Sequence, residues 1–178
     1  MNKILMLIGF FGSLAVCRAD LSFYDANLDP FQEVPPHNTP GYGNADFSFD
    51  STTGILTVTG GVNGGIYADL LAGATTVWLQ DAAIGANGPT VALVTLNTPG
   101  NTSGTFGGAS GVLTTQQITD LESGNFYINI ADSVFPSGEI RGQLVAVPEP
   151  ATYLAAILLL IPFGVTLQRN QRFSAILP

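Results

Sequence analysis

Arg141 is the only lysine or arginine between residues 20 and 150, a stretch that also holds all 13 acidic residues of the chain. A guanidinium presents five N–H donors in a rigid fork and therefore seeks carboxylate or carbonyl oxygens. Glu139 lies two residues earlier, on the same face of the strand expected here. We interpret Arg141 and Glu139 as a structural clamp that ties this strand to neighbouring loops. A ligand-binding or catalytic arginine is the alternative.

Few other side chains of this sequence could carry chemistry. The chain has one histidine, His37 in a proline-rich segment, and one cysteine, Cys17 near the N-terminus. A histidine without a partner histidine or cysteine does not indicate a metal site, so we expect no metal and no cofactor. The single tryptophan, Trp78, offers a large ring that can pack in the core or stack on a ligand such as a glycan.

The acidic residues form no pattern typical of an active site. No glycine-rich phosphate loop, Ser–His–Asp set or Cys/His cluster is present. Two pairs of carboxylates could come close in space: Asp120 with Glu122 along the chain, and Asp132 with Glu139 across the expected hairpin. No motif supports a catalytic role for either pair. We therefore expect a protein that is not an enzyme. A cation-binding module or a metal-dependent enzyme is the alternative, and either would need several acidic residues converging on one ion.

Composition and charge restrict the class of protein. The 178 residues are enough for one domain, only 10% of them are charged, and 21 are glycine, which is typical of an all-β secreted domain. With 13 acidic residues against one arginine, residues 20–150 carry a net charge of −12. This charge argues against binding to nucleic acid or to anionic lipid.

Period-two alternation of apolar and polar residues predicts the strands that position these side chains. The residues from Phe126 read as a half-buried strand, and Pro136, Ser137 and Gly138 as a turn. A capping box of Thr114 and Gln117 predicts one short helix. We expect an antiparallel β-sandwich of about seven or eight strands with Greek-key connections. The predicted strands lie at residues 21–28, 44–50, 55–59, 75–79, 90–96, 126–131 and 139–144, with a glycine-rich loop at 97–108.

Both ends of the chain read as targeting segments. Residues 1–19 combine Lys3, an apolar run and a small final residue, the pattern of a signal peptide. At the other end, an uncharged run at residues 151–167 predicts a transmembrane helix. Arg169 and Arg172 follow it as a basic stop, and residues 173–178 form a short extension.

Residues 126–144, FYINIADSVFPSGEIRGQL, resemble the closing motif of the CHRD domain, a module of bacterial secreted proteins. FQEVPP at residues 31–36, GANGP at 85–89 and the residues from Leu113 onward resemble further family motifs in the same order, so the resemblance implies a CHRD-like domain at residues 20–146. The family pattern places a histidine, an apolar residue and a histidine where this chain has Trp78, Leu79 and Gln80, and a third histidine where it has Ala131. If those histidines form a metal or polar site in relatives, the resemblance implies that this chain lacks it.

The tail at residues 147–172 resembles the PEP-CTERM sorting signal of Gram-negative bacteria. It starts with the sorting motif Val147, Pro148, Glu149 and Pro150, followed by the apolar run and the basic stop. The resemblance implies that an exosortase cuts near this motif and frees the domain from the inner membrane. It thereby implies export to the cell surface or extracellular matrix, with the exosortase and the secretion machinery as partners. Exopolysaccharide or another matrix component is a further candidate partner. An uncleaved tail anchor is the alternative.

Overall fold

The computed structural model describes residues 21–59 and 64–148, which form ten strands, one 3₁₀ helix and one α-helix. In chain order these are β1 (Leu21–Leu28), η1 (Pro30–Gln32), β2 (Tyr42–Asp50), β3 (Ile55–Val58), β4 (Gly65–Ala68), β5 (Ala74–Asp81), β6 (Thr90–Leu96), β7 (Gly104–Val112), α1 (Thr115–Glu122), β8 (Phe126–Asp132), β9 (Ile140–Gln143) and β10 (Val145–Val147).

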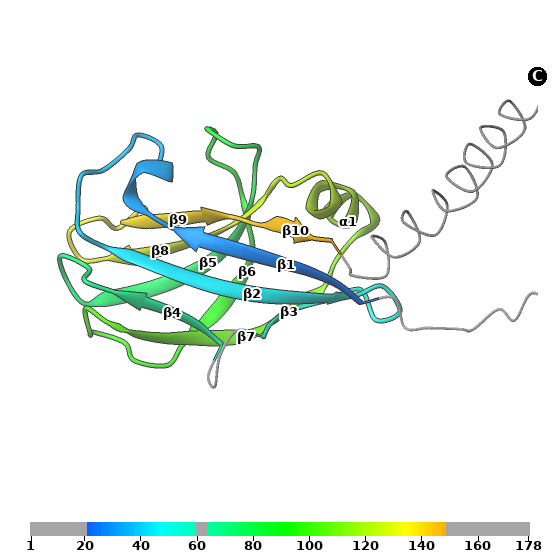
Figure 1. Ribbon diagram of the computed structural model, residues 1–178, viewed down its shortest axis with the longest axis horizontal. Coiled ribbons are helices and arrows are strands. Elements are labelled where there is room, and N and C mark those ends of the chain that lie inside the picture. The colour runs from blue at the N-terminus through cyan, green and yellow to red at the C-terminus, as the bar shows by residue number, and fades with distance from the viewer. Residues whose placement is uncertain (1–20, 60–63, 149–178) are drawn as a thin grey trace, which may run out of the picture.

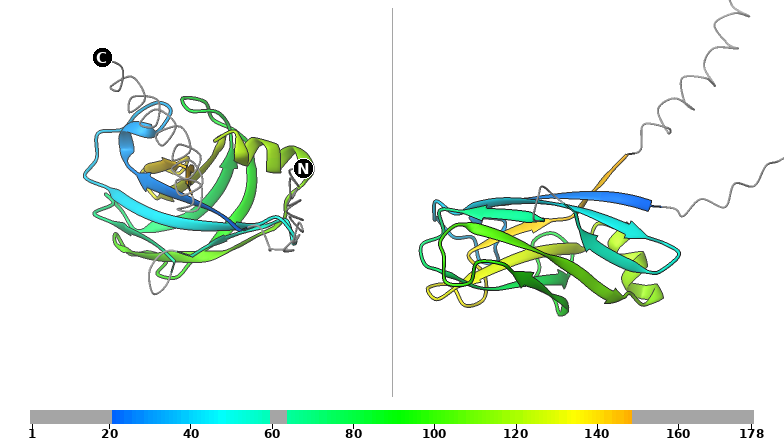
Figure 2. Two further views of the ribbon diagram at one scale, coloured as in Figure 1. Left: turned by 45° about the vertical axis from the view of Figure 1, so that its right-hand side comes forward. Right: turned by 90° about the horizontal axis from the view of Figure 1, so that it is seen from below.

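The ten strands belong to one antiparallel sheet, in the order β10-β1-β2-β3-β7-β6-β5-β8-β9, with β4 pairing to β2 and β7 beside this path. The sheet curls over until its two ends approach each other (Figures 1 and 2). There the N–H of Asp29, just after β1, donates to the carbonyl of Arg141 in β9 at 3.0 Å, and the Arg141 N–H donates back at 3.2 Å. This closure leaves few unpaired backbone groups at the sheet edges.

The connections confirm an all-β antiparallel fold and contain a Greek key. β7, β6 and β5 lie side by side in reverse chain order, and β8 returns after α1 to pair with the free edge of β5. The predicted number of strands was wrong, because the described residues form ten strands in one curled sheet rather than seven or eight in two facing sheets. Glycine-rich β4 and β7 lack a predictive pattern, and β7 begins inside the stretch predicted as a loop, at Gly104.

The hydrophobic core fills the inside of the curled sheet. β8 contributes Phe126, Ile128 and Ile130, all fully buried, to this core. The prediction that β8 is half buried was wrong, because its outward residues Tyr127 and Asn129 are buried as well. Loops cover the outer face of β8, and that covered face is where the polar motif residues gather. Core residues from the other elements include Tyr24, Leu28, Phe47, Phe49, Leu56, Tyr67, Val77, Leu79, Phe106, Leu121, Ile140 and Leu144.

Helix α1 begins at the predicted capping box. The Gln117 N–H donates to the Thr114 hydroxyl at 3.3 Å, and the Thr114 N–H donates to the Gln117 side-chain oxygen at 2.9 Å. Leu121 anchors the helix in the core, and Gly124 follows it with φ of 75°, a left-handed conformation that glycine adopts without strain.

We expect Thr114→Ala to lower the free energy of unfolding by about 1 kcal/mol, because the N–H of Gln117 at the helix N-terminus loses the hydroxyl that accepts it. Urea denaturation measures this change. Thr115→Ala, at the exposed first position of α1, is the matched control and should change stability by less than about 0.5 kcal/mol. Equal effects of the two substitutions would contradict a capping role.

The two targeting segments lie largely outside the described residues. Val147, assigned from sequence to the sorting motif, belongs to β10 and pairs with Phe23 of β1. Glu149 and Pro150, the signal peptide at 1–19, the apolar run at 151–167, the basic stop and the extension at 173–178 are not described. Within residues 21–59 and 64–148, no helix is long and apolar enough to cross a membrane.

Candidate functional site

Six polar or aromatic side chains form two rows across the outer face of β5, β8 and β9. The register places Trp78 opposite Asn129, and Asn129 opposite Arg141. In the neighbouring row Gln80 lies opposite Tyr127, and Tyr127 opposite Gln143. Because alternate residues of a strand face the same side, all six side chains share this face.

Two segments fold over this face, and they carry motifs of the family resemblance. η1 and the loop after it hold FQEVPP, and the loop between β5 and β6 holds GANGP. Asn87 joins these two loops by donating its side-chain N–H to the carbonyl of Val34 at 2.8 Å. The N–H of Gly88 donates to the Tyr127 hydroxyl at 3.0 Å. Sequence segments more than 50 residues apart thus converge above β8 and β9.

Gly88 is required by a close approach of two backbones. A Cβ at this position would lie 1.8 Å from the carbonyl oxygen of Asp81, a distance that no real contact allows. The absence of a side chain therefore lets the GANGP loop lie directly against the end of β5. This contact fixes the loop above the outer face.

Arg141 is 1% exposed and connects the β9 strand to the GANGP loop. Its Nη1 donates to the carbonyl of Ala86 at 2.8 Å, and its Nη2 donates to the side-chain oxygen of Gln143 at 3.1 Å. The guanidinium carbon lies 3.4 Å from the centre of the Tyr127 ring, a cation–π contact. All of these partners are neutral. The bond between Arg141 and Glu139 that the sequence predicted is not formed.

Glu139 contacts a different loop. Its two carboxyl oxygens accept the N–H of Leu71 at 3.1 and 3.0 Å, and its side chain hydrogen-bonds to Asp132. Asp132 in turn accepts the N–H of Ala72 at 2.8 Å. Burial, followed by the hydrogen bond and the charge of Asp132, raises the pKa of Glu139 to about 7.

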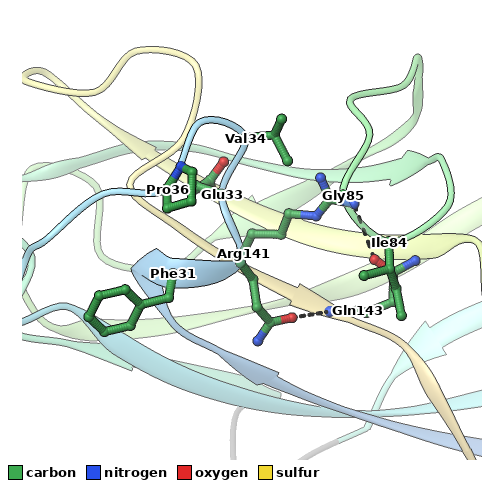
Figure 3. Close-up of a pocket in the computed structure, with 9 residues that line it drawn as sticks. Phe31, Glu33, Val34, Pro36, Ile84, Gly85, Arg141 and Gln143 are labelled. Carbon is green, nitrogen blue, oxygen red and sulfur yellow. Dashed lines mark hydrogen bonds between the residues drawn. The ribbon is translucent and has the colours of Figure 1, made fainter.

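A pocket of about 380 Å³, which we call the Arg141 pocket, opens beside the guanidinium (Figure 3). Phe31 and Ile84 stand at its rim, 67% and 82% exposed. Glu33 lines it, is 5% exposed, and has one carboxyl oxygen without a hydrogen-bond partner. Burial raises the pKa of Glu33 to about 7, although Arg141 opposes this shift. The lining residues are Phe31, Gln32, Glu33, Val34, Pro36, Ile84, Gly85, Arg141 and Gln143.

A second pocket of about 330 Å³, which we call the Trp78 pocket, lies over β5 and β8 on the same face. Trp78 is half-buried in its wall. Asn129 is 3% exposed, and its side-chain oxygen has no hydrogen-bond partner. Asn87, which bonds to Val34 of the Arg141 pocket, also lines this second pocket and so stands between the two. The lining residues are Trp78, Gln80, Asn87, Thr90, Tyr127, Asn129 and Ser137.

The positions where the family pattern places histidines lie on this outer face. Trp78 and Gln80 line the second pocket, and Ala131, opposite Thr76 of β5, is buried nearby. His37 packs elsewhere, its ring centre 4.2 Å from that of Phe135. Among the residues that the structure describes, no group of three or more histidine, cysteine, aspartate or glutamate side chains is arranged to hold a metal ion.

Sequence reasoning found Arg141, Glu139 and Trp78 but missed their neighbours. Glu33, Tyr127, Asn129 and Gln143 complete the two pockets. Gln143 had a signal in the sequence, because it alternates with Arg141 on one strand. Tyr127 and Asn129 had none, since their place in the site depends on the pairing of β8 with β5 and β9.

The curled Greek-key sheet and the paired pockets define a small all-β domain whose motif loops gather on one outer face. The family model of the CHRD domain matches residues 24–144, and the chain belongs to this family. The CHRD domain is an extracellular-type β domain, which is compatible with a non-catalytic secreted protein. Neither a curated protein nor a solved structure matches the chain.

Proposed function

We propose that this protein is a non-catalytic bacterial domain that is exported by its signal peptide, processed by an exosortase, and displayed on the cell surface or in the extracellular matrix. One observation carries the proposal. β10 ends at Val147, and the sequence continues directly into Pro148, Glu149 and Pro150. A cut at this motif would release all ten strands intact, including the pairing of β10 with β1.

The contacts of the buried polar groups support a role other than catalysis. Arg141 bonds to Ala86 and Gln143, and Glu139 bonds to the backbone of Leu71. These groups hold loops in place, whereas a catalytic group needs donors or acceptors free to meet the substrate. The expected partners are the secretion machinery and an exosortase, and the apolar run at 151–167 would anchor the protein in the inner membrane before processing.

We expect that replacing Pro148, Glu149 and Pro150 by alanines leaves the protein bound to the membrane and unprocessed, because the exosortase loses its recognition motif. Fractionation of the host, with mass spectrometry of both mature ends, measures this outcome. Gln116→Ala, on the exposed face of α1, is the control that should be processed normally. A released, trimmed product from the triple variant would overturn the sorting proposal.

A cation-binding or metal-dependent role finds less support in the geometry. The buried carboxyl groups of Asp132 and Glu139 hydrogen-bond to each other and accept N–H groups from Leu71 and Ala72. Such a pair is already satisfied without an ion. Metal analysis of the purified full chain tests this alternative, and a tightly bound ion in stoichiometric amount would favour it over the non-catalytic role.

A further inference from the structure

We propose that the Trp78 pocket binds one unit of a neutral glycan, with the sugar ring stacked against Trp78 and its hydroxyls bonded to the surrounding amide and hydroxyl side chains. This inference deepens the proposed function by naming a ligand class. Only the source of the glycan, the extracellular matrix, depends on the proposed function.

Trp78 supplies the surface that a sugar ring needs. The side chain projects from the outer face of β5 and is half-buried in the wall of the pocket. Its neighbours Val77 and Leu79 point into the core, so the strand that carries Trp78 is held rigidly. A partly exposed indole ring combines apolar contact area with a polar N–H edge, which suits ligands that have an apolar face and polar rims.

The polar lining matches a ligand rich in hydroxyl groups. Gln80, Asn87 and Asn129 contribute amides, and Thr90 and Ser137 contribute hydroxyls. Amides and hydroxyls each provide both donors and acceptors, as sugar hydroxyls do. The side chains that line the pocket are uncharged, in a segment of net charge −12. Arg141 lies behind Tyr127 and donates to Ala86 and Gln143, so an anionic ligand would lose its hydration without a direct bond to a cation.

Asn129 is the strongest single sign of a ligand. Its side-chain nitrogen donates to the Gln80 side-chain oxygen and to the Ser137 carbonyl, both at 3.1 Å. These bonds fix the amide, and they leave its oxygen buried without a donor. A buried acceptor without a partner costs about 1–3 kcal/mol, and a ligand hydroxyl at the inner end of the pocket would supply the missing donor.

The pocket is held in shape before any ligand binds. Gln80 donates its side-chain N–H to the carbonyl of Gly88 at 3.3 Å, and the Tyr127 hydroxyl accepts the Gly88 N–H at 3.0 Å. A volume of about 330 Å³ is near the lower end of ligand pockets. This size suits one sugar unit, with the rest of the glycan lying over the surface.

The test uses Trp78 as its own reporter, because it is the only tryptophan of the chain. The full-length protein, in a detergent that carries no sugar, is titrated with cellotriose, maltotriose and chitotriose. We expect a saturable change in tryptophan emission with at least one of them, at a Kd on the order of 1 mM. No saturable change with any of the three would overturn the proposal.

Calorimetry of variants then locates the site. We expect Trp78→Ala to weaken binding at least tenfold and Trp78→Phe to retain most of it. Phe31→Ala removes the exposed ring at the rim of the Arg141 pocket and should leave binding unchanged. Thr90→Phe, at an exposed position of the rim, fills the Trp78 pocket and should abolish binding even if Trp78→Ala fails to fold. Wild-type affinity in Thr90→Phe would exclude this pocket.

A charged probe tests the ligand class. Trigalacturonate has the size of the neutral trisaccharides and carries carboxylates, so we expect it to bind at least tenfold more weakly. Binding as tight as that of the best neutral trisaccharide would refute neutral selectivity. These readouts come from purified protein, whereas the export proposal is read from cell fractions and mature ends, so the failure of either is recognisable separately.

Discussion

Arg141→Ala should lower the free energy of unfolding by about 3–5 kcal/mol, the largest effect that we expect from one substitution in this protein. The change removes the donors that satisfy the carbonyl of Ala86 and the side chain of Gln143. It also empties the space against the Tyr127 ring, where the guanidinium lies 3.4 Å from the ring centre. Orphaned acceptors and a new cavity add their costs in one buried place.

Urea denaturation of the wild type and two further variants measures this effect. Arg141→Lys keeps the charge but loses the planar fork, and should forfeit more than half of the stabilisation. Phe31→Ala, in the same pocket at an exposed position, should cost less than about 1 kcal/mol. An unchanged midpoint for Arg141→Ala would refute the role of Arg141 as a clamp.

A double-mutant cycle separates this arrangement from the ion pair predicted by sequence. Arg141 and Glu139 contact different loops, so Arg141→Ala and Glu139→Gln should change stability additively, within about 0.5 kcal/mol. A directly bonded pair would show a larger coupling energy. Because Arg141 is buried among neutral partners, its contribution should also persist in 1 M salt, where exposed ion pairs are screened.

The sequence predicted those parts of the fold that have a local signal. β1, β2 and β8 alternate, α1 has its capping box, and the turn before β9 has proline and glycine. β7 was missed because its glycines offer little side-chain surface to reveal alternation, and its strand conformation depends on pairing with β3, β4 and β6. Such pairing partners lie too far along the chain for a local pattern to show.

The candidate site illustrates the same limit. Arg141 was identified as a central residue because it is the only basic residue between 20 and 150. The partner predicted for it, Glu139, was wrong. Glu139 precedes the first residue of β9 and follows Gly138, whose φ is 132°, so the strand rule that places alternate residues on one face does not extend to it. Asn129 became visible only through register, since a shift of one residue would have turned it into the core.

Stability should fall as the pH rises from 5 to 8, because two buried carboxyls are easier to protonate in the folded protein than in the unfolded chain. Burial is the largest cause of the raised pKa of both Glu33 and Glu139, which reach about 7 from an ordinary 4.5. Between these two values the folded state binds more protons than the unfolded state. The stabilisation is therefore complete below about pH 4.5 and is lost as the pH passes through about 7.

Thermal unfolding at pH 5 and pH 8, at one ionic strength, should differ by about 2–3 kcal/mol in favour of pH 5. Glu139→Gln replaces the protonated carboxyl by a neutral group of the same shape, so it should remove about half of the difference and stabilise the protein at pH 8. Glu122→Gln, at the C-terminal end of α1, is the matched control and should keep the wild-type profile. Stability that rises from pH 5 to pH 8 would mean that Glu33 and Glu139 are ionised in the folded protein, with Arg141 outweighing burial at Glu33.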